Sequence, residues 1–102
     1  MQKECFKMTT IYTRRIYFSA PGAGLTAKDV HKRIEGVAPI VGAVLDDSAW
    51  HRNDEVKILN VIISTSEPDV YYAELTPKQV EIATDVQRYV EMTKSHGWSS
   101  NY

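Results

Sequence analysis

Residues 19–30 read SAPGAGLTAKDV, and the interpretation of this stretch decides the fold class. The stretch contains GAGLTA, which fits the pattern GxGxxA that opens dinucleotide-binding folds. The glycines could equally make a simple turn between two elements. The residues on either side must distinguish a phosphate cradle from a turn.

The residues that follow the glycines carry three signals of a helix start. Thr26 is a good N-cap, Asp29 stands where a capping box has its acid, and Leu25 can pack against Val30 as a hydrophobic staple. An apolar stripe at helical spacing is made of Ala27, Val30, Ile34 and Val37. We therefore predict a helix that begins after Thr26 and ends at Gly36.

Several features argue against a dinucleotide site. The preceding strand carries Thr13, Arg14 and Arg15, which do not suit a parallel strand that is covered on both faces. Both glycines fall before Thr26, and a chain of 102 residues has room for only one βαβ unit, half of what a dinucleotide spans. We interpret PGAG as a turn and predict no nucleotide or other cofactor.

Three segments have the composition of strands. Residues 11–20, IYTRRIYFSA, alternate imperfectly, with Tyr12, Ile16, Phe18 and Ala20 on one side. Residues 40–50 and 56–64 flank the polar turn HRNDE and predict a β-hairpin. Its second strand is apolar on both faces, as in a central strand.

The C-terminal part predicts helices. SEPD at residues 66–69 can cap a short helix through about Glu74, and LTPKQV at residues 75–80 repeats the helix-start pattern of LTAKDV. Gly97 followed by Trp98 fits a Schellman ending. The buried stripe of this last helix is expected to be Ile82, Val86, Tyr89, Val90 and Thr93.

These elements predict an α+β domain in the order β-α-β-β-α-α, with a three-stranded antiparallel sheet of order 1-3-2 and helices packed mainly on one face. We expect a flexible N-terminal tail over residues 1–9, a single domain over 10–98 and a C-terminal tail over 99–102. No apolar run approaches the roughly 20 residues of a spanning helix. Because the N-terminal MQKECFKMTT lacks the apolar stretch of a secretory signal, we expect a cytoplasmic protein.

No motif in the sequence identifies catalytic chemistry. Cys5 is the only cysteine, and the three histidines His31, His51 and His96 show no metal-ligand spacing. The acid-rich stretch DDSAWHRNDE, residues 46–55, could ligate a divalent cation, although it is better explained as a solvated loop. We expect no enzyme and no metal site; a small metal-dependent or nucleotide-dependent enzyme is the third hypothesis.

Charge is distributed unevenly along a chain whose formal net charge is only −1. The residues up to Arg33 include seven bases and two acids, whereas the remainder has five bases and eleven acids. The two parts therefore have balances of +5 and −6. Such asymmetry suits electrostatic association with a charged partner.

The leading hypothesis is a non-catalytic protein-interaction module with an acidic and aromatic face that engages a basic partner. Carboxylates would steer this partner while aromatic side chains anchor it. One form of this hypothesis is an inhibitor that competes with nucleic acid, typical of phage or mobile-element counter-defence. The predicted partner-binding residues are Asp46, Asp47, Trp50, Asp54, Glu55, Glu67, Asp69, Tyr71, Tyr72 and Glu74.

The alternative is a weak nucleic-acid-binding regulator that uses the basic N-terminal region. Bases interleaved with aromatics are typical of nucleic-acid surfaces, but the sequence pI is only about 6.3. The predicted contacts are Arg14, Arg15, Lys28, Lys32 and Arg33, beside Tyr12 and Tyr17.

Overall fold

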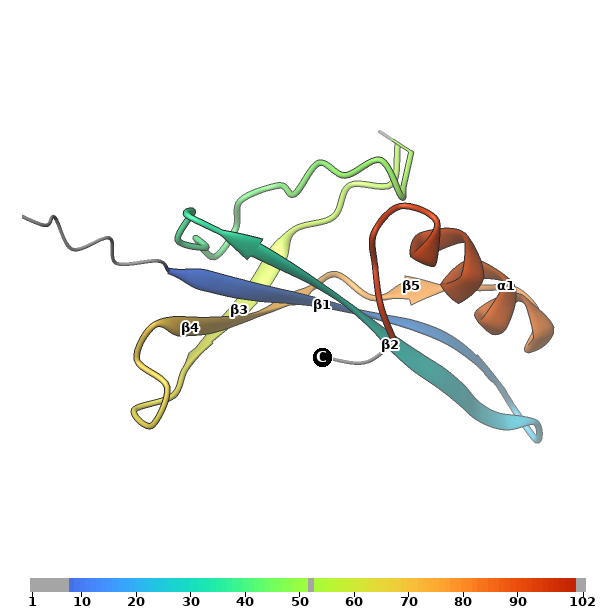
Figure 1. Cartoon of the computed structure of the whole chain (residues 1–102). Coiled ribbons are helices and arrows are strands. Elements are labelled where there is room, and N and C mark those ends of the chain that lie inside the picture. The colour runs from blue at the N-terminus through green and yellow to red at the C-terminus, as the bar shows by residue number, and fades with distance from the viewer. Residues whose placement is uncertain (1–7, 52, 101–102) are drawn as a thin grey trace, which may run out of the picture.

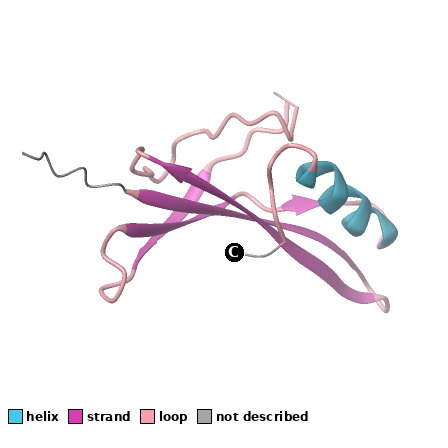
Figure 2. Cartoon of the chain, in the orientation of Figure 1, coloured by secondary structure: helices cyan, strands magenta, loops and turns pink. Residues whose placement is uncertain are grey.

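The structure is a computed structural model that describes residues 8–51 and 53–100. Within these residues a twisted five-stranded mixed sheet is accompanied by a single helix (Figures 1 and 2). The elements are β1 (Thr9–Ala20), β2 (Gly24–Glu35), β3 (Ile58–Ile63), β4 (Val70–Leu75), β5 (Lys78–Gln79) and α1 (Thr84–Lys94). The prediction of a three-stranded antiparallel sheet with several helices is therefore wrong. Residues 1–7 and 101–102 of the expected tails lie outside the described residues.

β1 and β2 form a long antiparallel hairpin where a strand and a helix were expected. All twelve residues of each strand pair, from Thr9 with Glu35 to Ala20 with Gly24. The connecting turn requires Gly22, whose φ is +78°, because this left-handed conformation strains residues with a Cβ atom. The glycines thus make a turn, as predicted, but the turn leads into a strand.

β4 is a strand where a short helix was expected over residues 66–74. It lies parallel to β1, with Thr9 beside Val70 and Thr13 beside Glu74. The run VYY is aromatic and β-branched, which favours a strand, while SEPD lies in the turn that precedes it. This parallel pairing makes β1 and β4 the two central strands of the order β2-β1-β4-β3.

β3 is an edge strand, not the central strand that its apolar sequence suggested. Residues 40–50, expected to be its hairpin partner, belong to an irregular segment, residues 36–51 and 53–57, which we call the crossing loop. Only a short part of this loop meets the start of β3: the Ile58 N–H donates to the Ala43 carbonyl at 2.9 Å, and the Gly42 N–H donates to the Ile58 carbonyl at 2.8 Å.

The C-terminal helix exists but is shorter than predicted. Lys78 and Gln79 pair in parallel with Ile16 and Tyr17 as β5, so α1 begins only at Thr84. Its ending is confirmed as a Schellman motif. The Gly97 N–H donates to the Lys94 carbonyl at 3.2 Å, the Trp98 N–H donates to the Thr93 carbonyl at 3.1 Å, and Gly97 has a φ of +90°.

The sheet has one covered face and one open face. α1 and the crossing loop lie over the covered face, and among the described residues no helix or long loop covers the opposite face (Figure 1). Even-numbered residues of β1 and β2 point to the covered face, as shown by the complete burial of Arg14, Ile16 and Val30. Val86 and Val90 of α1 complete this core together with both tryptophans.

Candidate interaction surface

Arg14 fastens the crossing loop to the sheet from inside the core. Its side chain is 1% exposed, and its Nη1 and Nη2 atoms each donate to a carboxylate oxygen of Asp54 at 3.0 Å. Its Nε donates to the Thr76 carbonyl at 2.9 Å, and its guanidinium lies 4.9 Å from the ring centre of Trp50. A buried charge needs such a complete set of partners.

Lys32 makes a second attachment between β2 and the crossing loop. Its Nζ donates to Asp47 Oδ2 at 2.8 Å and to the His96 carbonyl at 3.1 Å. The other oxygen of Asp47 accepts from the Trp98 indole at 3.1 Å and from the Ala49 amide at 2.9 Å. Asp47 therefore joins the loop, the sheet and the residues after α1.

The two ion pairs lie on either side of a tryptophan pair. The ring centres of Trp50 and Trp98 are 5.1 Å apart at an angle of 49°. Arg14 packs on Trp50, and the Lys32 Nζ lies 5.7 Å from the Trp98 ring centre. Because both cations and both rings are held from several sides, this part of the loop is anchored firmly.

The pairing shifts the titration of both aspartates. Burial raises the pKa of Asp47, but hydrogen bonds from Lys32, Ala49 and Trp98 lower it by more, so the pKa lies below its usual value. Burial also raises the pKa of Asp54, and the hydrogen bonds and charge of Arg14 again outweigh it. Both aspartates are therefore ionised partners in the fold at neutral pH.

Two neighbouring hollows open beside the anchored loop. The first, which we call the apolar hollow, has a volume of about 250 Å³ and is lined by Tyr12, Lys32, Ile34, Val37, Leu45, Asp46, Asp47 and Trp98. The second, which we call the acidic hollow, has a volume of about 290 Å³ and is lined by Val44, Leu45, Asp46, Trp50, His51, Asp54 and Glu55. Leu45 and Asp46 line both, so they separate the two hollows.

Large aliphatic side chains project into solvent next to the apolar hollow. Val37, Ile40, Val41 and Val44 of the crossing loop are between 56% and 70% exposed. Four exposed aliphatic residues within eight positions of one loop leave much apolar side-chain surface in contact with water. We call these four residues the apolar loop patch.

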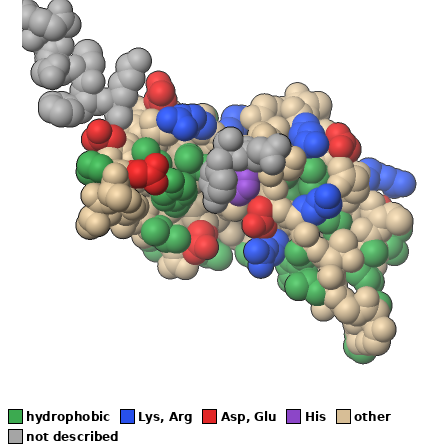
Figure 3. All heavy atoms as spheres, turned by 60° about the horizontal axis from the view of Figure 1, so that its bottom comes forward, with side chains coloured by type: hydrophobic (Ala, Val, Ile, Leu, Met, Phe, Trp, Pro, Cys, Tyr) green, Lys and Arg blue, Asp and Glu red, His purple; other side chains and the backbone are tan. Residues whose placement is uncertain are grey.

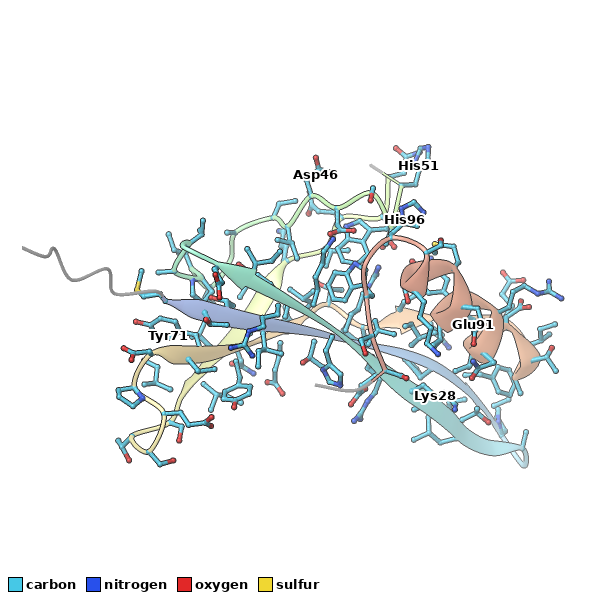
Figure 4. All side chains as sticks on the ribbon, viewed as in Figure 1. Lys28, Asp46, His51, Tyr71, Glu91 and His96 are labelled. Atoms are coloured by element: carbon cyan, nitrogen blue, oxygen red, sulfur yellow. The ribbon has the colours of Figure 1, made fainter. Side chains whose placement is uncertain are left out.

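The ten predicted partner-binding residues lie in two parts of the fold. Asp46, Asp47, Trp50, Asp54 and Glu55 lie in the crossing loop, whereas the other five lie in β4 and in the turn before it. Figure 4 shows Asp46 above the sheet and Tyr71 at one end of it. Within the second group the Tyr72 hydroxyl donates to Glu67 at 2.8 Å.

The five predicted nucleic-acid contacts are also divided. Arg14 and Lys32 serve the attachments described above, and Arg15 donates to Asp29 at 3.0 Å on the open face. Lys28 and Arg33 are exposed. In Figure 3, which looks toward the open face, basic side chains are interspersed with acidic and apolar ones.

Sequence reasoning missed the role of Arg14, although a signal was present. Residues 12, 14, 16 and 18 share one side of a strand, so Arg14 stands between Tyr12 and Ile16 on the apolar face. A base at such a position predicts a buried ion pair with a distant acid. The apolar loop patch was missed because residues 40–50 were assigned to a paired strand.

Comparison with protein-family models, curated proteins and solved structures finds no match for this chain. Among residues 8–51 and 53–100, no helix has the length and apolar character needed to cross a membrane. The same residues contain no group of three His, Cys, Asp or Glu side chains placed to hold a metal ion.

Proposed function

We propose that this protein is a non-catalytic interaction module that binds a basic protein through the crossing loop. The observation that carries the proposal is the apolar loop patch, because its four large aliphatic side chains face solvent on a loop that the sheet holds in place. Exposed apolar area beside rigidly held neighbours supports binding with little ordering cost.

Asp46 favours a partner with positive charge. This carboxylate is exposed, lines both hollows, and has no ion pair among the described residues. Asp47 and Asp54 are neutralised by Lys32 and Arg14. Since the predicted acids divide between the crossing loop and the β4 region, we propose a basic protein as the partner without mimicry of nucleic acid.

A pull-down from cells that naturally contain the protein tests this proposal. The full chain is compared with Val41→Lys, which places a charge in the apolar loop patch, and with Ile82→Lys as the matched control. Ile82 precedes α1 and is 52% exposed, close to the 58% of Val41. We expect mass spectrometry to identify a basic protein that Val41→Lys loses and Ile82→Lys retains.

A second pair of variants tests the charge of the partner. Asp46→Lys should release the captured protein, whereas Glu81→Lys, which reverses an exposed acid outside the loop, should not. Near-ultraviolet circular dichroism of the tryptophan pair verifies that each variant is folded. Equal capture by all variants would contradict the proposal.

A further inference from the structure

The two hollows differ in chemistry but share one wall. Leu45 and Asp46 form this wall, and the Leu45 N–H donates to the Val56 carbonyl at 2.7 Å, which holds the wall in place. Any chain that lies across the wall would reach both hollows. The inference below rests on the proposed function, because it specifies what kind of segment the basic partner presents here.

The apolar hollow is built to receive an uncharged side chain. Carbon-rich parts of Tyr12, Ile34, Val37 and Trp98 dominate its lining. Of the three charged residues that line it, Lys32 and Asp47 bond to each other at 2.8 Å, and Asp46 lies at the boundary with the acidic hollow. Burying an aliphatic group here removes apolar surface from water and leaves the existing ion pair intact.

The acidic hollow favours a cation beside the shared wall. Asp54 is already bound by Arg14, and Glu55 has an exposed partner in Lys57 at 3.4 Å. Asp46 has no ion pair among the described residues and lies at the boundary between the hollows. Electrostatic complementarity therefore places a basic group next to the apolar side chain.

We infer that the two hollows bind a single extended segment of the partner, in which a large aliphatic side chain fills the apolar hollow and a neighbouring lysine or arginine contacts Asp46. The aliphatic residue anchors the segment, and the basic residue sets its direction along the wall. The partner is thus recognised by an aliphatic residue close in sequence to a basic one.

The tryptophans allow each hollow to be observed separately. Trp98 lines the apolar hollow and Trp50 lines the acidic hollow, and the chain has no third tryptophan. Both indole N–H groups are hydrogen-bonded, to Asp47 and to the Leu45 carbonyl. Their two side-chain signals in a ¹H–¹⁵N correlation spectrum report local occupation of the two hollows.

The probes are capped peptides in which leucine and arginine are separated by zero, one or two glycines, as in Ac-Gly-Leu-Gly-Arg-Gly-NH2. At least one spacing should shift both indole signals saturably. Replacing the leucine of that peptide with alanine should remove the Trp98 shift. Replacing its arginine with glutamine should weaken binding and reduce the Trp50 shift.

Matched variants locate the contacts on the protein. Val37→Gln should abolish the Trp98 shift. Ile82→Gln, which makes the same aliphatic-to-amide change at an exposed residue before α1, should leave it unchanged. Asp46→Asn should weaken the best peptide by about threefold to fivefold, the scale of one exposed ion pair. The inference would be overturned if no peptide shifted the indole signals. It would also be overturned if the signals shifted when the protein alone was concentrated, since a second copy would then fill the hollows.

This outcome is separable from that of the pull-down. If a basic protein is lost with Val41→Lys while no peptide moves the indoles, the proposed function stands and the inference is wrong. If no captured protein depends on the loop, the proposed function is wrong, whatever the peptides do. Displacement of the captured protein by an excess of the best peptide would support both.

Discussion

At the scale of single residues, Arg14 shows how one buried cation determines where a distant loop lies. Asp54 is forty positions away in sequence, yet both of its oxygens accept from the Arg14 guanidinium. Removing one member of a buried ion pair leaves the other charge without that partner. This loss costs more folding free energy than replacing both members with well-packed apolar residues.

Arg14→Met should therefore lower the free energy of unfolding by about 3 kcal/mol, measured by urea denaturation. The control is Arg15→Gln on the same strand, where the Arg15–Asp29 pair is exposed and its loss should cost less than about 1 kcal/mol. Equal effects of the two substitutions would show that Arg14 is not the residue that attaches the loop.

The same ion pairs predict how stability depends on pH. Asp47 and Asp54 have pKa values below the usual value of about 3.9, so the native state binds fewer protons than the unfolded chain near that pH. Their contribution is complete above about pH 5 and is lost as the pH falls through their folded pKa values. Unfolding free energies measured from pH 6 to pH 3 should decline, and the decline should be shallower in Asp54→Asn. An unchanged slope would mean that Asp54 does not carry this linkage.

At the scale of elements, β2 explains why the fold class was predicted wrongly. Val30 and Ile34 are four residues apart, and this spacing puts them on one side of a helix and equally on one side of a strand. The capping residues around Thr26 led to the prediction of a helix, but each cap stabilises a helix by only about 1 kcal/mol. Twelve paired residues along β1 outweigh them.

Elements whose contacts are local were easier to predict than those that depend on distant pairing. β1, the turn at Gly22 and the end of α1 follow from short-range signals. β4 does not, because its strand state depends on β1 about sixty positions earlier. The same holds for the site: Asp46 and Trp50 were named from the sequence, whereas the place of Trp98 and the pairing of Lys32 with Asp47 follow only from the fold.

The Schellman motif gives a prediction for the end of α1. Gly97 has a φ of +90°, and its position must allow the Trp98 N–H to reach the Thr93 carbonyl. Gly97→Ala should cost about 1 kcal/mol in urea denaturation, because a Cβ atom disfavours this conformation. Gly97→Asn should cost less, since asparagine tolerates the left-handed region better. If alanine were as stable as glycine, the ending would not require a left-handed residue.

At the scale of the whole molecule, folding pairs the basic first part of the chain with the acidic remainder. Arg14 and Lys32 come from the part with a balance of +5, and Asp54 and Asp47 from the part with a balance of −6. These four charged residues, which suggested two opposite binding surfaces, therefore hold the loop to the sheet. What the loop presents outward is the apolar loop patch with Asp46 beside it.

β3, with the sequence ILNVII, has no charge and no proline, and beyond its start the described chain does not pair with its outer side. Such an edge is a template for pairing with another chain, particularly where it exposes side chains such as Ile62, which is 50% exposed.

Ile62→Lys should slow heat-induced aggregation, measured by light scattering at a fixed temperature below the melting transition, because a charge on the edge opposes strand pairing. Leu25→Lys is the matched control, since Leu25 is 65% exposed at the far hairpin and the substitution adds the same charge. A general effect of net charge would slow both variants equally. Only a slower rate confined to Ile62→Lys identifies β3 as the edge through which the molecules associate.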